Sequence, residues 1–454
     1  MDSGFNQKFI EGGVWLTLSS FLIRAVGFFS VFIVLSNTEV KDYGLYKLVL
    51  AAFAFLTGFF FSGFDNLVIS DLARERGEGR MDRVKRLFLE YSGVKLLIGA
   101  ILFLAAFFGA PLLGRFVDPE VMQFLPLVSI LFIFYALERP LNYLFNTYLK
   151  FKYLALYTLV EEIGKLGLIL IFVFFLEMGA KGIIIADVFS SGIAFVALLP
   201  VGVILLKDLL RYEISVEKML LPIIRLHGKW GIATRYLDEI KKSIRPWLIK
   251  YFVGIEAVGL YSMAEGIYGQ ITNLFPLSNI LLPLLPGEIG NHKKIREILV
   301  LGLKFGTPFF ILLGASASVA VTILVHLLFP NYIPALTIFY IMLGHLLIAA
   351  FANVLTAILY AERQQRAQFA ITAVTIAFMA ATGALMLYSF GIIGIAFEFL
   401  LTAFFYTALR ARFIFRMRPE FRFSLVETIF WRKADLDIIR RSVKIALYNF
   451  TKII

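Results

Sequence analysis

The chain has 454 residues, of which 60% are hydrophobic and only 17% are charged. Soluble domains are about half apolar and about a quarter charged, so this composition excludes an ordinary soluble enzyme, and we expect no catalytic activity. The absence of Cys excludes disulfides and thiolate metal sites. The four His are scattered without ligand spacing, so we expect no bound metal and no cofactor.

Apolar stretches long enough to cross a membrane recur along nearly the whole chain. A spanning helix needs about 20 mostly apolar residues, because the hydrocarbon layer is roughly 30 Å thick. The sequence therefore predicts an all-α membrane protein with about twelve spans. We place them at 10–35, 44–70, 92–113, 122–148, 154–176, 182–206, 229–253, 258–285, 298–327, 334–360, 368–388 and 391–410.

The basic residues between these spans gather on one side of the predicted membrane. If the N-terminus is cytoplasmic, the loops on the opposite side carry only Lys41, Arg115 and Lys181. Almost all other loop Lys and Arg, including the cluster at 71–91, then lie in the cytoplasm. Because positively charged loops stay inside, we predict a multi-pass protein of the cell membrane with both termini cytoplasmic. This asymmetry accounts for the net charge of +12 without a nucleic-acid partner.

The segment after the last predicted span, 411–454, alternates apolar residues with many Arg and Lys. A basic amphipathic helix of this kind is typical of a segment lying on the anionic lipids of the cytoplasmic leaflet. The alternative is a helix that docks onto a partner protein.

Two short motifs repeat at almost the same distance. Residues 41–46 (KDYGLY) and 256–261 (EAVGLY) are offset by 215 positions, and 179–183 and 391–395, both Gly-x-x-Gly-Ile, by 212. Each pair occupies the same place relative to the predicted spans, so we infer two homologous six-helix halves, an organisation typical of transporters. The predicted parts are an N-terminal lobe at 1–206, a cytoplasmic linker at 207–228, a C-terminal lobe at 229–410 and the tail at 411–454.

The same motifs carry a family resemblance. The run 38–46, the pair Ala73-Arg74 that opens a basic loop, and above all 251–262 (YFVGIEAVGLYS) resemble the polysaccharide-exporter branch of the multidrug/oligosaccharidyl-lipid/polysaccharide (MOP) superfamily, the O-antigen-type flippases. The resemblance implies two six-helix lobes around a central cavity that opens to alternate sides, and a lipid-linked sugar as cargo. Two positions depart from the family pattern: Ser36 stands where an Arg is common, and Arg245 where an Asp is common.

Charged residues inside the predicted spans indicate function, since a charge at the centre of a spanning helix costs roughly 2.5–3.5 kcal/mol. Arg24 lies in the middle of the first span, where it either faces a cavity or pairs with Asp65 of the second. Asp65 could therefore be a structural counter-ion or a site for a coupled cation. Glu265 in the eighth span is a second candidate for cation coupling.

The seventh span is the richest in charge. Arg235, Asp238, Lys242 and Arg245 follow one another at steps of three or four residues, so they share one helical face. This face is either a solvated turn below the membrane or part of the cavity. Arg245 and Lys250 are the deeper residues, and for them we favour the cavity. In the fourth and fifth spans we predict structural ion pairs, with Glu161 and Lys165 one helical turn apart.

A cationic pocket suits a phosphate or diphosphate group. The predicted substrate-binding residues are Arg24, Lys47, Arg235, Lys242, Arg245 and Lys250. Together with the lipid-linked sugar that the resemblance implies, this leads us to predict a monomeric transporter that flips a polyprenyl-diphosphate glycan from the cytoplasmic to the outer leaflet. Moving about two negative charges outward releases roughly 4–5 kcal/mol per 100 mV of inside-negative potential, so no ATP is required, and coupled Na⁺ or H⁺ remains open.

Other functions fit less well. A cation-coupled multidrug exporter of the same superfamily is the main alternative, although it favours an acidic, aromatic pocket. A peptidoglycan-precursor flippase usually carries two further helices. A sugar polymerase needs a large outer loop with catalytic acids, and the predicted outer loops are short.

Overall fold

The computed structural model describes residues 3–61, 65–113, 118–227, 229–274, 277–281, 285, 291–362, 364–423 and 427. These residues form helices joined by short turns, and no strand occurs among them. Helices of the first half are α1 (Ser3–Asn37), α2 (Val40–Phe61), α3 (Asp65–Gly77), α4 (Met81–Leu113), α5 (Pro119–Met122), α6 (Leu125–Thr147), α7 (Phe151–Ile169) and α8 (Gly179–Leu210). A π-helical segment, Leu170–Phe175, extends α7.

The described residues of the second half are also helical. Its helices are α9 (Leu220–His227), α10 (Lys229–Phe252), α11 (Ile255–Asn273), α12 (Leu277–Leu281), α13 (His292–Leu328), α14 (Ala335–Leu343), α15 (Leu346–Ala361), α16 (Gln365–Phe390) and α17 (Ile392–Met417). Every predicted span coincides with a helix or with a pair of consecutive helices. Six helices within the described part are long and apolar enough, by length and composition alone, to cross a membrane, or seven if α14 and α15 form one span.

Several boundaries differ from the prediction. The predicted span 44–70 covers two helices, because α2 ends at Phe61 and α3 begins at Asp65. Asp65 therefore lies in the first turn of a helix, where the unpaired amides favour an acidic side chain. Helix α4 starts at Met81, well before the predicted 92.

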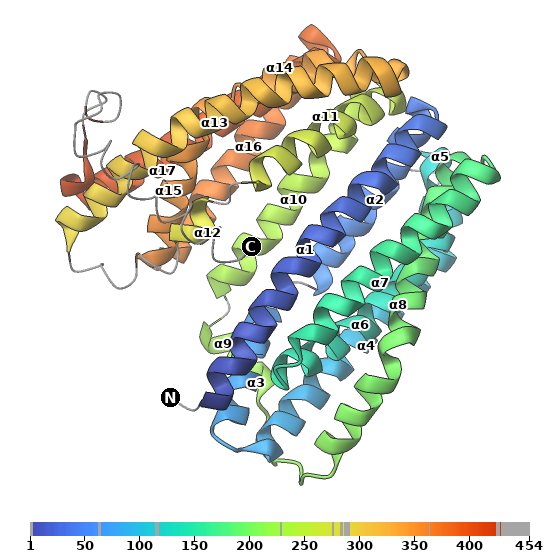
Figure 1. Ribbon diagram of the computed structural model, residues 1–454, viewed down its shortest axis with the longest axis vertical. Helices are drawn as coiled ribbons and strands as arrows, with labels where there is room; N and C mark the ends of the chain where they lie inside the picture. The colour runs from blue at the N-terminus through green and yellow to red at the C-terminus, as the bar shows by residue number, and fades with distance from the viewer. Residues whose placement is uncertain are drawn as a thin grey trace, which may run out of the picture. The chain divides into compact units, whose positions relative to one another are not determined.

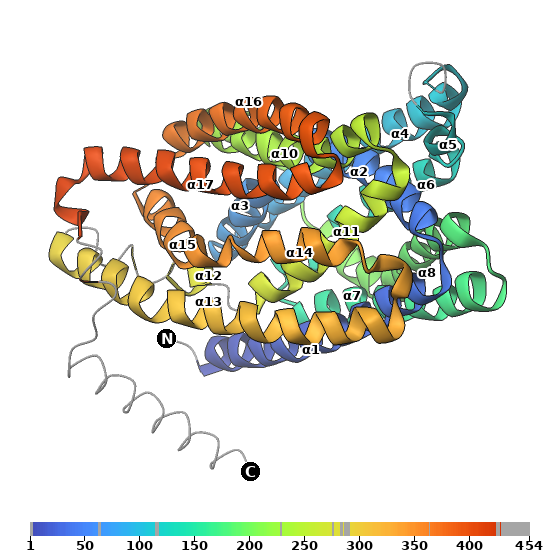
Figure 2. The same ribbon diagram turned by 90° about the horizontal axis from the view of Figure 1, so that it is seen from above.

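The predicted span 334–360 is broken. Figure 2 shows α14 and α15 as two segments, which meet at an angle of 54° near Gly344 and His345. At the C-terminal end, α17 continues to Met417. Most of the predicted amphipathic tail lies outside the described residues, so its membrane-surface role stays a prediction.

Contacts divide the chain into two compact units. The first comprises 1–264, 324–336 and 380–395, and the second comprises the remaining segments, 265–323, 337–379 and 396–454. These bounds follow packing and not the sequence repeat, so the lobe boundaries at 206 and 229 stay a prediction. Figure 1 shows the long helices α1, α7 and α8 of the first unit, and α7 packs against both of the others.

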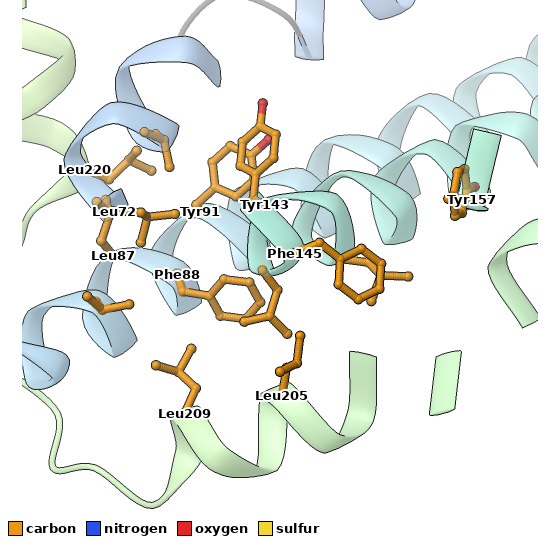
Figure 3. Packing of buried hydrophobic residues seen from close by; sticks show 14 of the residues in the cluster. Leu72, Leu87, Phe88, Tyr91, Tyr143, Phe145, Tyr157, Leu205, Leu209 and Leu220 are labelled. Carbon is orange, nitrogen blue, oxygen red and sulfur yellow. The ribbon is translucent and has the colours of Figure 1, made fainter. Parts of the chain in front are cut away.

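The first unit has a well-defined apolar core. Helices α3, α4, α6, α8 and α9 meet around Leu72, Leu87, Phe88 and Leu209, which are almost fully buried (Figure 3). Tyr91 and Tyr143 stack within this core, with ring centroids 4.7 Å apart. The core extends from the apolar faces of α4 and α8 onto the amphipathic helices α3 and α9. It thus holds the predicted cytoplasmic segments, 71–91 and part of the linker, against the transmembrane helices.

The predicted basic loop is folded into ordered ion pairs. Glu75 is buried at the end of α3, and its carboxylate accepts a hydrogen bond from Arg80 at 2.5 Å. Burial alone would raise the pKa of the Glu75 carboxyl, but the surrounding guanidinium groups of Arg80, Arg74 and Arg83 outweigh it and hold the pKa below its usual value. Part of the positive charge of this loop is therefore neutralised within the protein.

Candidate functional site

Helix α10 carries most of the predicted substrate-binding residues, and their exposure changes along it. Arg235 and Lys242 are exposed, and Lys242 forms an ion pair with Glu239 on its own helix at 3.1 Å. Arg245, one turn farther along, is only 8% exposed. The charged face predicted from the spacing therefore runs from a solvated start to a buried end, and Arg245 lies at the buried end.

Helix α10 packs along α2. The close approach depends on Gly58 of α2, because a Cβ atom there would lie 2.3 Å from Cγ of Glu239. The structure therefore brings the charged helix against the element that carries Lys47. Lys47 is half-buried, and its ammonium lies over the rings of Tyr43 and Tyr46, at 5.1 and 5.4 Å from their centroids.

Lys250, at the end of α10, is engaged in an ion pair that the sequence did not predict. Its Nζ lies 2.7 Å from Oδ2 of Asp118. Asp118 also caps the short helix α5, since Oδ1 accepts a hydrogen bond from the Glu120 amide at 2.8 Å. Burial would raise the pKa of the Asp118 carboxyl, but Lys250 and the amide hydrogen bonds lower it below its usual value. An anionic cargo at Lys250 would have to displace this carboxylate.

Asp65 has a different counter-ion from the one considered from sequence. Its Oδ1 lies 2.6 Å from Nζ of Lys95 on α4, and accepts a hydrogen bond from the Tyr91 hydroxyl at 3.2 Å. Asp65 is 4% exposed and Lys95 is completely buried. Lys95 is therefore a counter-ion of Asp65 that the sequence did not indicate. A coupled cation at Asp65 would have to displace or neutralise the Lys95 ammonium.

A second, partly buried ion pair lies between α7 and α8. Lys165 contacts Asp187 at 2.5 Å and the Tyr46 hydroxyl at 3.4 Å, whereas Glu161 accepts a hydrogen bond from Ser191 at 2.7 Å. The predicted Glu161–Lys165 pairing is thus replaced by pairing between helices. The Lys165–Asp187 pair could have been considered from the sequence, because the two residues carry opposite charges in consecutive apolar spans.

The remaining candidates lie in both units. Arg24 is exposed on α1 of the first unit. Glu265 is half-buried on α11 in the second unit, one turn before Tyr268. The Tyr268 hydroxyl is hydrogen-bonded to Nδ1 of His345, and both rings pack against Phe399. This polar pair was not predictable from the sequence, because the four His residues are scattered without a spacing pattern.

All six predicted substrate-binding residues belong to the first unit. Three of them, Arg235, Lys242 and Arg245, fall on one face of α10, and Lys47 lies on the neighbouring α2. Among the described residues, no group of three or more His, Asp or Glu is arranged to hold a metal ion. The arrangement is that of cationic and aromatic side chains on adjacent helices.

Solved structures of low sequence identity share this fold. An inward-facing multidrug resistance MATE family transporter of the MOP superfamily aligns with a TM-score of 0.73 and 13% identity, over 87% of this chain and 94% of its own. The lipid II flippase MurJ, in an inward closed conformation, aligns with a TM-score of 0.68 and 14% identity, over 91% and 90%. The fold is thus the two-lobed helical fold of MOP-superfamily transporters, as the sequence predicted.

A third structure has the same fold. It is a MOP superfamily transporter from Pyrococcus furiosus, described as having a binding pocket of reverse polarity, with a TM-score of 0.61 and 11% identity over 90% and 95% of the two chains. No curated protein sequence matches. The family model described as "Polysaccharide biosynthesis protein" matches residues 38–334, and the chain belongs to that family. The chain is therefore a member of this polysaccharide-biosynthesis family with the fold of MOP-superfamily transporters. Its long apolar helices are those of a multi-pass membrane protein.

Proposed function

We propose that this transporter moves a polyprenyl-diphosphate-linked glycan from the cytoplasmic to the outer leaflet by alternating access. The observation that carries the proposal is the buried guanidinium of Arg245 at the end of the charged face of α10, in a chain of a polysaccharide-biosynthesis family. The planar guanidinium suits a diphosphate because it donates paired hydrogen bonds to phosphate oxygens.

The other cationic residues define a path toward Arg245. Arg235 and Lys242 are exposed at the beginning of α10, which the charge asymmetry of the loops predicts to be its cytoplasmic end. They would attract the headgroup, and Lys47 and Arg245 would hold it deeper among the helices. In this proposal both termini are cytoplasmic and one chain is the functional unit.

The driving force follows from the charge of the cargo. An inside-negative potential favours outward movement of an anion by about 2.3 kcal/mol per charge and 100 mV. Coupling to Na⁺ or H⁺ through Asp65 or Glu265 would add to this force. At Asp65, coupling requires that the cation and Lys95 compete for the same carboxylate, which lies 2.6 Å from the Lys95 ammonium.

Ligand-dependent stabilisation tests the cargo. A ligand that binds only the folded state raises its stability by about 2.7 kcal/mol at a concentration of 100 times Kd. We expect a polyprenyl-diphosphate glycan to raise the apparent melting temperature of the detergent-purified protein. The same glycan on an uncharged polyprenol, and organic cations, should not. Stabilisation by organic cations alone would contradict the proposal and favour the multidrug exporter.

A further inference from the structure

The repeated Gly-Leu-Tyr motifs, which contain none of the predicted substrate-binding residues, pack against each other. Gly44 is in the first turn of α2, and Gly259 is in the first turn of α11. Both are buried, as are the tyrosines that close the two motifs, Tyr46 and Tyr261. Both helix starts belong to the same compact unit.

The contact is reciprocal. A Cβ atom on Gly44 would lie 2.1 Å from the carbonyl oxygen of Ile255, four residues before Gly259. A Cβ atom on Gly259 would lie 2.2 Å from the carbonyl oxygen of Val40, four residues before Gly44. Adding 215 to Gly44 gives Gly259, and adding 215 to Val40 gives Ile255, so the two contacts are equivalent under the sequence repeat. This self-complementary geometry is that of a contact across a two-fold axis.

Only glycine permits this contact. Backbone Cα–H groups approach carbonyl oxygens to about 3.3–3.6 Å, so a methyl group at either position would force α2 and α11 about 1 Å apart. Because the atoms opposite each glycine are backbone, a flexible side chain cannot yield to relieve the clash.

Further contacts join the two halves of the sequence around the glycines. Tyr43 packs edge-to-face on Tyr332, with centroids 6.1 Å apart, and Phe32 packs on Phe329 at 5.3 Å. The Lys250–Asp118 ion pair, described above, likewise joins α10 to the turn before α5. Each contact pairs a residue before position 120 with one after 249, and all lie within the first compact unit. By the predicted topology, all of them are at the outer ends of the spans.

We propose that the two Gly-Leu-Tyr motifs form the outer gate of the transporter, which is closed in this structure. Alternating access requires the outer ends of the two halves to meet while cargo enters from the cytoplasm. The glycines let α2 and α11 meet backbone to backbone, and the surrounding aromatic pairs complete the closure. The proposal rests on alternating access and not on the identity of the cargo.

The absence of native Cys makes the gate directly testable. Leu48, one turn beyond Gly44 on α2, is completely buried. A Leu48→Cys reporter, exposed to a membrane-impermeant maleimide in right-side-out vesicles, should react poorly when the glycines are native. Adding Gly44→Ala or Gly259→Ala should increase the labelling severalfold from the outer side. Inside-out vesicles show whether the label enters from the cytoplasmic side.

Gly266→Ala is the matched control. Gly266 is also in α11, but a Cβ atom there meets no described atom within 4 Å. Gly259→Ala and Gly266→Ala replace Gly by Ala in the same helix and gain the same helix propensity, so the clash at position 259 distinguishes them. Unchanged labelling in folded Gly44→Ala and Gly259→Ala proteins, or labelling only from the cytoplasmic side, would overturn the proposal.

A second measurement tests the closed gate without changing the glycines, so it can be made even if the glycine variants do not fold. With native glycines, Cys at positions 32 and 329 should be joined efficiently by a short reducible bis-thiosulfonate, because the native rings are in contact. Failure to cross-link would overturn the closed gate. Neither readout requires a cargo, so a wrong cargo leaves both expectations intact, and a wrong gate leaves cargo binding intact.

Discussion

Arg245→Ala is expected to slow the movement of a diphosphate-linked glycan by about ten- to a hundredfold in reconstituted vesicles. A hydrogen bond to a charged group contributes about 1.5–3 kcal/mol, and each 1.4 kcal/mol corresponds to a factor of about ten. Arg245 is 8% exposed, so water can replace little of what the guanidinium provides. The measurement is the rate of flipping, together with the ligand-induced shift in melting temperature.

Two further variants make the Arg245 result interpretable. Arg245→Lys keeps the charge but loses the paired donor geometry, so it should retain an intermediate rate. Arg225→Ala, which removes an exposed guanidinium from α9, should leave the rate unchanged. A well-folded Arg245→Ala protein that transports at the native rate would remove Arg245 from the substrate site.

Lys95→Ala is expected to destabilise the protein more than any substitution of an exposed cation. Removing one partner of a buried ion pair costs about 3–5 kcal/mol, because the other charge is left buried without compensation. Asp65 would then keep the hydroxyl groups of Tyr91 and Tyr143, which compensate a buried carboxylate less well than an ammonium group does. The apparent melting temperature in detergent should fall by several degrees.

A comparison with an exposed ion pair shows how much of the stability loss is due to burial and how much to the loss of a charge. Lys242 pairs with Glu239 but its side chain is 69% exposed, so Lys242→Ala should cost less than about 1 kcal/mol. Combining Lys95→Met with Asp65→Asn removes both buried charges and should recover much of the loss. Equal melting temperatures for Lys95→Ala and Lys242→Ala would show that the buried pair does not stabilise the fold.

The fold was predictable because the features that determine it are visible in short stretches of the sequence. Apolar stretches of membrane length, the one-sided distribution of Lys and Arg, and the offset of 215 residues between Gly44 and Gly259 indicate twelve helices in two related halves. The family resemblance predicted from the same motifs is confirmed by the family match and by the solved structures.

Helix ends were less predictable because they depend on tertiary packing. The basic segment 71–91 looks like a loop on hydropathy alone. Its apolar residues Leu72, Leu87 and Phe88 instead bury against α8 and α9, and this packing extends α3 and α4 into it. The bend between α14 and α15 has no strong signal either, since no Pro lies between Ala335 and Ala361.

The partners of the charged residues were the hardest to predict. Sequence spacing shows which charges share a helix, as it did for Arg235, Lys242 and Arg245. It does not show which charges meet between helices, so Lys95–Asp65, Lys165–Asp187 and Lys250–Asp118 emerged only from the structure. In a low-dielectric interior such pairs form wherever packing allows, and their positions are set by the fold. The substrate-binding roles of the cationic residues stay predictions.

The central claim is that the protein moves an anionic lipid-linked glycan and that the charge of the headgroup drives the movement. The most direct measurement is flipping of a fluorescent polyprenyl-diphosphate glycan in proteoliposomes under an imposed membrane potential. The proposal predicts net movement toward the positive side that grows with the potential, and no movement of the same glycan on an uncharged lipid. Equal movement of both lipids, or movement that does not respond to the potential, would contradict it.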